Sequence, residues 1–251
     1  MRRDTATSAV PRKPELLGQT VVVIGGSAGI GLETARRAGA EGAAVIITGR
    51  TPERLDRAAS ELDALSTAAF DATDAAALEQ FFRDLPRPID HVMVTAGRPH
   101  YGRVLDMSVA EARRALDEHL LLVLQVARNA IGRVRPAGTL LFMGGTGGRR
   151  AGIGILPTLT AALPALISSL ALELAPIRAN LIAAGFVDTA LSASILGDQL
   201  DARRNELRAT LPIRRVVGPA DVAALAVHIM ANTALTGATY DVDGGQQLVA
   251  G

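Results

Sequence analysis

The sequence predicts an α/β fold in which helices cover both faces of a doubly wound parallel sheet of about seven strands. Three observations predict it. Short apolar runs rich in β-branched residues alternate with helical patterns along the chain. These runs are almost continuously apolar, as expected of parallel strands buried on both faces. No internal repeat or interdomain linker interrupts the alternation.

The strands are expected, in order, at residues 20–24, 44–48, 66–70, 89–95, 139–143, 179–184 and 238–242, with 66–70 the weakest run. Helix start signals lie between them. Pro52 follows Thr51 and occupies the first position of a helix. Ser108 and Glu111 form a capping-box pattern before a long helical segment, 109–133. Gly218-Pro219 opens a helix that continues to residue 231.

The segment Gly154–Leu174 has the most apolar helical pattern, with Glu173 as its first charged residue. A membrane span needs about 20 mostly apolar residues, but this segment contains two prolines, two threonines and two serines and lies between two expected strands. It is therefore interpreted as a crossover helix buried on more than one side. A second subunit is the expected cover, and Pro164 is expected to bend or interrupt the helix.

The composition excludes several classes of partner and site. There are 26 basic and 25 acidic residues, so a nucleic-acid partner is not expected. The chain has no cysteine, and His91 and His228 have no partners at metal-binding spacing, so no metal site is expected. Residues 1–16 are expected to form a loose arm before a single domain, 17–251. We expect a cytoplasmic protein without membrane association, because the arm has no apolar segment of the secretory type.

The strongest motif is a glycine-rich turn between the first strand and the first helix, Gly25-Gly26-Ser27-Ala28-Gly29-Ile30-Gly31. Glycines there permit a tight turn, and the helix N-terminus offers N–H groups and a positive dipole to a pyrophosphate. This is the arrangement of Rossmann-like dinucleotide sites. The alternative is a turn with a purely structural role.

The end of the second strand reads Thr48-Gly49-Arg50. An acidic residue near this point would bind the adenosine ribose of NAD, whereas an arginine can pair with the 2′-phosphate of NADP. NADP(H) is therefore expected in preference to NAD(H). The alternative is that Arg50 is an ordinary surface residue.

These features together resemble the short-chain dehydrogenase/reductase family, from about Leu17 to Gly251. The glycine motif matches at Gly25, Gly29 and Gly31, and the ending Tyr240–Gly245 resembles the family's closing strand and loop. The resemblance implies a cofactor site made by Gly25, Ser27, Gly29, Ile30, Gly31, Arg50, Asp71, Ala72, Thr95, Ala96, Gly97, Gly185, Val187 and Thr189. It also implies a homodimer or homotetramer in which the 109–133 and 154–174 segments form an interface.

The catalytic positions depart from the family's pattern. The family uses a Ser, a Tyr-x-x-x-Lys pair on the crossover helix and an Asn on the preceding helix. Residues 150–178 contain neither Tyr nor Lys. One alignment places Leu156 and Thr160 at the Tyr and Lys positions, and a shift of two places Thr158 and Ala162 there. The serine region reads Met143-Gly144-Gly145-Thr146, and the Asn position is occupied by His119.

Two residues are candidate replacements. His119 could relay a proton near neutral pH, or could simply pack against the sheet. Tyr101 lies in a loop that borders the substrate pocket in this family, with His100 beside it. The alternative is that Tyr101 is an aromatic residue that lines the pocket or anchors the loop. An unassisted tyrosine has a pKa near 10 and is a poor acid or base at neutral pH. The loop Gly144–Arg150 could bind an anion or form a flexible turn.

Three functions remain open. The first is an NADP(H)-dependent oxidoreductase with a non-standard active site and an unidentified substrate. The second is an NADP(H)-binding sensor or partner subunit without turnover. The third is another reaction on the same fold, such as elimination or isomerisation.

Overall fold

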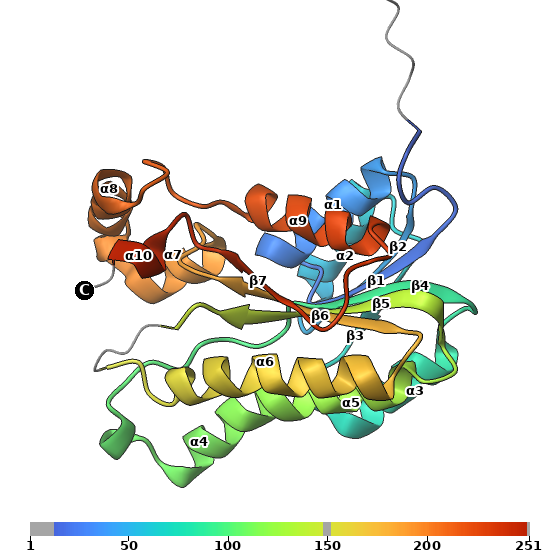
Figure 1. Cartoon of the computed structure of the whole chain (residues 1–251), viewed down its shortest axis with the longest axis horizontal. Coiled ribbons are helices and arrows are strands. Elements are labelled where there is room, and N and C mark those ends of the chain that lie inside the picture. The colour runs from blue at the N-terminus through green and yellow to red at the C-terminus, as the bar shows by residue number, and fades with distance from the viewer. Residues whose placement is uncertain (1–12, 148–151, 250–251) are drawn as a thin grey trace, which may run out of the picture.

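A computed structural model describes residues 13–147 and 152–249, and its centre is one parallel sheet of seven strands in the order β3-β2-β1-β4-β5-β6-β7. The expected α/β class, with helices on both faces, is confirmed (Figure 1). The strands are β1 (Thr20–Ile24), β2 (Ala44–Gly49), β3 (Ser66–Ala69), β4 (Ile89–Val94), β5 (Val134–Gly145), β6 (Arg178–Ala184) and β7 (Thr239–Val242).

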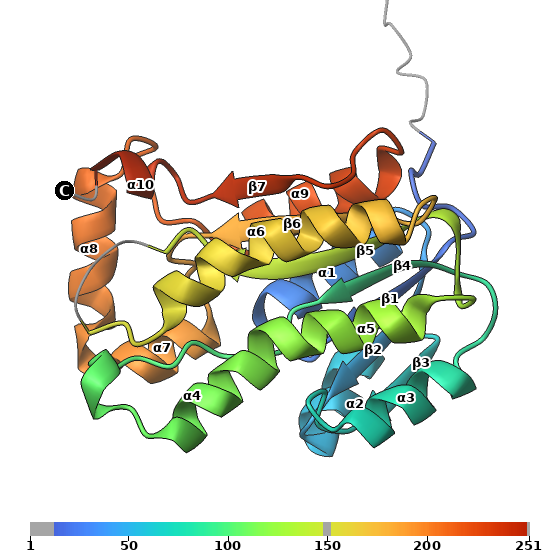
Figure 2. The same ribbon diagram turned by 60° about the horizontal axis from the view of Figure 1, so that its bottom comes forward.

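Helices form a layer on each face of the sheet, as Figures 1 and 2 show from two directions. One layer consists of α1 (Gly29–Ala40), α2 (Pro52–Leu62) and α9 (Pro219–Ala231). The other consists of α3 (Ala75–Asp84), α5 (Leu122–Ala130) and α6 (Leu156–Glu173). Each layer has its own core, because alternate residues of a strand point to opposite faces. In β1, Val22 belongs to the core of the second layer and Val23 to that of the first.

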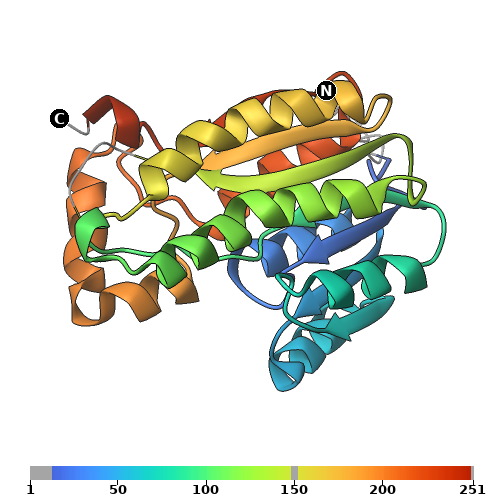
Figure 3. The same cartoon turned by 90° about the horizontal axis from the view of Figure 1, so that it is seen from below.

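The remaining helices gather at one end of the sheet (Figure 3). They are η1 (Val104–Asp106), α4 (Val109–Leu116), α7 (Ala190–Leu196), η3 (Gly197–Gln199), α8 (Leu200–Thr210) and α10 (Gln246–Val249). The carboxyl ends of the parallel strands point to this end. The connection after β1 leads to β2 on one side of it, and the connection after β4 leads to β5 on the other side. The strand order therefore reverses between β1 and β4. A doubly wound sheet forms its ligand crevice at such a point.

Two expected elements differ from the structure. Strand β5 runs over Val134–Gly145, much longer than residues 139–143, because its first residues pair with β4 through an irregularity in register. The segment expected as one helix over 109–133 is divided by a π-helical turn, η2 (Asp117–Leu121), between α4 and α5. Side-chain patterning does not reveal such a turn, and π-turns occur often at functional sites.

Pro164 does not interrupt α6, so that part of the prediction was wrong. Helix α6 continues through it from Leu156 to Glu173. Proline removes only one helical hydrogen bond, and here Leu163 and Ile167, on either side of it, are fully buried against the sheet. Packing of this apolar face therefore holds the helix together.

The fold begins before residue 17, where the expected domain starts. Leu16 is completely buried, and its amide donates to the Glu41 carbonyl oxygen at 3.0 Å. Leu16 is thus part of the core and not of a loose arm. The earlier part of the expected arm, residues 1–12, lies outside the described residues.

Candidate active site

The glycine turn forms a closely packed cradle between β1 and α1. Gly25 has a φ of +95°, and a Cβ there would lie 2.7 Å from the Ala96 amide nitrogen. A Cβ at Gly31 would lie 2.3 Å from the Gly25 carbonyl oxygen. Only glycine fits both positions, and the first turn of α1 leaves N–H groups without partners inside the helix. This cradle therefore fits a dinucleotide pyrophosphate.

Gly29 connects this cradle with the segment that follows β6. Its φ is +55°, and a Cβ there would lie 3.6 Å from Cγ2 of Thr189. Ser27, within the turn, packs on β2, where its Oγ would lie 2.8 Å from a Cβ at Gly49. The fold thus brings the turn beside two of the other expected cofactor segments.

Arg50 and Asp71 meet at the ends of β2 and β3. Nη1 of Arg50 lies 4.0 Å from Oδ2 of Asp71, and both side chains are more than half exposed. The pKa of Asp71 is lowered, mainly by a hydrogen bond from the Thr73 amide. The arginine is therefore held only loosely and can turn to a phosphate. Ala72, the next expected residue, is buried.

A cavity of about 900 Å³ opens at the same end of the sheet. The expected site residues in its wall are Ile30, Thr95, Ala96, Gly97, Tyr101, His119, Gly185, Val187 and Thr189. The expected residues Gly25, Ser27, Gly29, Gly31, Arg50, Asp71 and Ala72 are not part of this wall. They lie beside it, where the adenosine half of a dinucleotide would extend.

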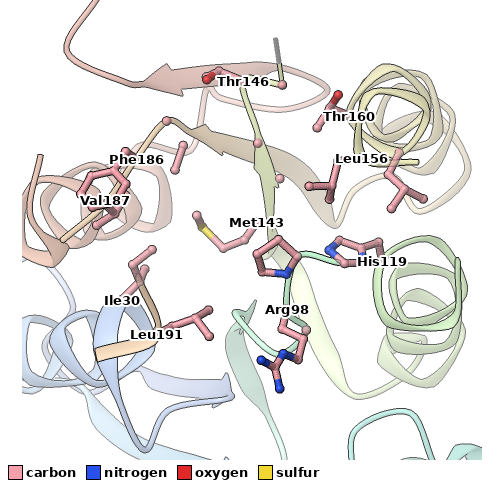
Figure 4. Close-up of a pocket in the computed structure, with 18 of the residues that line it drawn as sticks. Ile30, Arg98, His119, Met143, Thr146, Leu156, Thr160, Phe186, Val187 and Leu191 are labelled. Carbon is pink, nitrogen blue, oxygen red and sulfur yellow. The ribbon is translucent and has the colours of Figure 1, made fainter. Parts of the chain in front are cut away.

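Most other side chains of the wall are apolar. They include Leu122, Val123, Phe142, Met143, Ile153, Leu156, Leu159, Leu163, Phe186, Leu191, Ile195 and Leu196. Figure 4 shows Met143, Leu156 and Leu191 projecting into the same space from different elements. Such a cavity suits a ligand with a bulky apolar body.

The structure shows which of the aligned residues of α6 face the cavity. Leu156 and Thr160 line the cavity, whereas Thr158 is exposed on another face and Ala162 is not part of the wall. The Thr160 hydroxyl donates to the Pro157 carbonyl oxygen at 3.1 Å. Of the two pairs of residues, Leu156 and Thr160 are therefore the pair that faces the cavity (Figure 4).

His119 lies in the π-turn η2 and reaches the cavity on the same side as Leu156 (Figure 4). Its Nδ1 lies 2.9 Å from the Ala115 carbonyl oxygen, which can only accept a hydrogen bond. Nδ1 therefore carries the proton. Burial lowers the pKa of His119, although the Ala115 hydrogen bond and Glu118 partly oppose this. A neutral ring follows, with the lone pair on Nε2.

Glu118 is a site residue that the sequence analysis did not single out. Its side chain is only 11% exposed, and its Oε2 accepts from Nε2 of His100 at 3.2 Å and from the Arg98 amide at 3.1 Å. These contacts fasten the loop after β4 to η2. Its position next to His119 in the sequence was the available signal, but only the π-turn brings both side chains to one cavity.

Tyr101 lies at the mouth of the cavity and not in its interior. Its side chain is 53% exposed. The adjacent Gly102 pairs with Ile153, with hydrogen bonds of 3.0 Å and 2.6 Å to Gly152 and Gly154. This pairing closes one side of the cavity. This position is better suited to a residue that borders the substrate than to a proton donor inside the cavity.

The segment after β6 forms the opposite wall. A Cβ at Gly185 would lie 2.7 Å from Cβ of Asp243, so the segment packs tightly against the loop after β7. Thr189 caps α7 in a capping box with Ser192. Val187 forms a bridge with Val217, which fixes the backbone between these two residues. Gly148, Arg149 and Arg150 of the candidate anion loop lie outside the described residues.

Two further features bear on the class of protein. Over residues 13–147 and 152–249, no group of three or more metal-ligating side chains lies together. In the same part of the chain, α6 is the one helix whose length and composition would allow it to cross a membrane. This helix packs on β5 and β6 through Leu163, Ile167 and Leu170.

Comparison with known proteins gives matches along nearly the whole chain. A family model described as Enoyl-(Acyl carrier protein) reductase matches residues 25–247. The chain is 27% identical to "Short-chain dehydrogenase/reductase ATR9" of Stachybotrys chlorohalonatus, covering 92% of this chain and 98% of the relative. It is 28% identical to the 3-oxoacyl-[acyl-carrier-protein] reductase MabA of Mycobacterium bovis, covering 96% and 98%. The solved structure of BdcA in complex with NADPH is 25% identical, covers 92% and 95%, and has a TM-score of 0.82.

Proposed function

The chain belongs to the short-chain dehydrogenase/reductase family of oxidoreductases, and on that basis we propose that it is an NADP(H)-dependent oxidoreductase with a non-standard active site and an apolar substrate. The alternative of a cofactor-binding sensor or partner subunit without turnover is not favoured by these relatives. Two of them carry reductase in their names.

The cradle supports a dinucleotide in this role. The amides at the start of α1 hold the pyrophosphate, and Arg50 takes the 2′-phosphate that distinguishes NADP from NAD. Thr189 and Val187 border the nicotinamide end. When bound there, a nicotinamide supplies or accepts a hydride, while the protein supplies orientation and excludes water.

The wall formed by α6 is the observation that supports a non-standard site. Leu156 has no proton to donate, and the hydroxyl hydrogen of Thr160 is already directed to a carbonyl oxygen. The tyrosines of the chain are Tyr101 and Tyr240, and its lysine is Lys13. Tyr101 is at the mouth of the cavity, and Tyr240 belongs to β7. His119 and its neighbours are therefore the groups that remain to contact the reacting part of the substrate.

A panel assay tests this function. NADPH binding is measured by fluorescence, and NADPH oxidation is then followed with ketones and aldehydes that have bulky apolar groups. We expect NADPH to bind, with carbonyl reduction about 10²- to 10⁴-fold slower than with a positioned acid, because that is the usual contribution of such a group. Failure to bind NADPH would refute the proposal. Rapid ketone reduction that is unchanged in both His119→Ala and Tyr101→Phe would show that another group supplies the proton.

A further inference from the structure

Hydrogen-bond acceptors reach the cavity wall on the side where Figure 4 shows His119 and Leu156. Two of them come from η2, where His119 and Glu118 both reach the cavity wall. Nδ1 of His119 is committed to the Ala115 carbonyl oxygen, and this leaves Nε2 as an acceptor. Across the described ranges 13–147 and 152–249, the structure shows no other hydrogen-bond partner for this ring.

The Glu118 carboxylate adds a second acceptor. Its Oε2 receives both hydrogen bonds, from the Arg98 amide and from the His100 ring. Its Oε1 has no hydrogen-bond partner within the part of the chain that the structure describes. A carboxylate oxygen that is largely shielded from water stabilises a donor or a positive charge placed beside it.

Hydroxyl groups near this wall do not supply a free proton. Those of Thr95, Thr160 and Ser192 donate to backbone carbonyl oxygens at 3.1, 3.1 and 2.8 Å. Figure 4 places Thr146 on the far side of the cavity from His119. Tyr101 is at the exposed mouth.

The positive side chains of the wall lie away from this corner. Figure 4 shows the Arg98 guanidinium extending away from the space between His119 and Leu156. Arg203 is paired with Glu206 at 2.8 Å and lies over the Phe186 ring. A cationic ligand group can therefore occupy the corner beside Glu118 without meeting a guanidinium there.

We propose that the substrate of this site is an imine in its protonated, iminium form, carried on an apolar ring system, with its N–H directed to Nε2 of His119 and to Glu118. This inference rests on the proposed oxidoreductase function and specifies its substrate class. The apolar lining accommodates the rings, and the two acceptors accommodate the charged nitrogen.

The chemistry of an iminium matches a wall without an acid. When a hydride adds to a carbonyl carbon, the oxygen gains the π-electron pair and requires a proton. When a hydride adds to an iminium carbon, the new C–H bond takes the hydride pair and the π pair returns to nitrogen. The product is a neutral amine, and no proton is consumed in the step. Reduced nicotinamide is the reductant that the proposal requires.

Ligand binding without turnover tests the inference. The probes are 1,2,3,4-tetrahydroisoquinoline, which is an ammonium ion at pH 7, and isochroman, in which oxygen replaces the nitrogen. Their affinities for the protein are measured by calorimetry, with and without NADP⁺. We expect the amine to bind at least about tenfold more tightly, as for one charge-assisted hydrogen bond.

Three variants test whether the two acceptors cause the preference for the amine over isochroman. His119→Phe keeps a flat ring and removes Nε2, and Glu118→Gln removes the charge while an amide oxygen can still accept from Arg98. Both should reduce the ratio of affinities severalfold. Glu173→Gln, at the opposite end of α6 from Leu156, is the matched control and should leave the ratio unchanged. Circular dichroism confirms that each variant is folded.

The outcomes separate this inference from the proposed function. Equal or tighter binding of isochroman, no binding of either probe, or a ratio unaffected in both acceptor variants would overturn the iminium site. NADPH binding, measured separately, would leave the cofactor assignment intact in each of those cases. In the turnover assay, 3,4-dihydroisoquinoline should be reduced with NADPH faster than 1-tetralone, and the reverse order would also overturn it.

Discussion

Arg50 and Asp71, which are separated by a helix and a strand in the sequence, meet with 4.0 Å between Nη1 of the arginine and Oδ2 of the carboxylate. The parallel pairing of β2 with β3 brings the ends of both strands to the same edge of the sheet. The two residues therefore lie together at the place expected for the adenosine end of a dinucleotide. Their contact is long and exposed, so it contributes little to stability.

Replacing Arg50 by alanine should weaken NADP⁺ binding by roughly tenfold or more and change NAD⁺ binding little. The physical reason is the loss of one charge-assisted contact with the 2′-phosphate. Titration of both nucleotides by calorimetry measures the two affinities. Arg54→Ala, which removes an exposed arginine of α2, is the control. Tighter binding of NAD⁺ than NADP⁺ by the unmodified protein would contradict the assignment.

Gly29→Glu should abolish nucleotide binding. The backbone φ of +55° disfavours a side chain at this position, and the added carboxylate would enter the space between the turn and Thr189. Binding of NADPH is followed by fluorescence, and folding by circular dichroism. Ala40→Glu adds the same charge at the exposed far end of α1 and should bind NADPH normally. Unchanged affinity in a folded Gly29→Glu protein would show that the dinucleotide binds elsewhere.

His91 should make the protein less stable as the pH falls. It is buried in β4, and burial lowers its pKa from 6.5 to about 3. Between these pH values the unfolded chain binds a proton that the folded protein excludes. The free energy of unfolding should therefore fall as the pH drops from about 6.5 toward 3, by up to about 1.4 kcal/mol per pH unit.

Urea denaturation at several pH values measures the effect of His91. The curve should be flatter for His91→Gln than for the unmodified protein, because the variant has no imidazole to protonate. His228→Gln, at an exposed position of α9, should retain the original slope. Identical slopes for the His91 variant and the unmodified protein would show that other groups control acid unfolding.

The α5–α6 surface should form a contact between two copies of the chain. Leu124 of α5 and Leu172 of α6 are 40% and 83% exposed there, and Leu121, at the end of η2 just before α5, is 45% exposed. Helices α5 and α6 run side by side in Figures 1 and 3. Light scattering at micromolar concentration should show a dimer or tetramer. Leu124→Arg should shift it toward monomer, because an arginine would lose hydration without gaining a partner.

A second leucine provides the control for that surface. Leu65, which is 58% exposed beside β3, lies away from α5 and α6. Leu65→Arg should keep the assembly of the unmodified protein. A monomeric unmodified protein would remove the interface prediction altogether.

The order of strands and helices could be predicted because it depends on local patterns. Apolar runs such as β1 and β2 are buried on both faces, and a glycine turn that precedes a helix is readable from spacing alone. The cap at Ser108 is also present as expected, with Glu111 completing the capping box. Of the bend or interruption expected at Pro164, the interruption was wrong, because burial of the apolar face of α6 outweighs the loss of one hydrogen bond.

By itself, the sequence determined the fold class and the family, since each depends on which residues occur at which spacing. Tertiary structure alone decided that Leu156 and Thr160, and not Thr158, face the cavity. It also decided that a π-turn brings Glu118 and His119 to one wall, and that the Ala115 carbonyl fixes the proton on Nδ1. The physical reason is that hydrogen-bond direction and helix phase depend on how distant segments pack, and residue order does not record this packing.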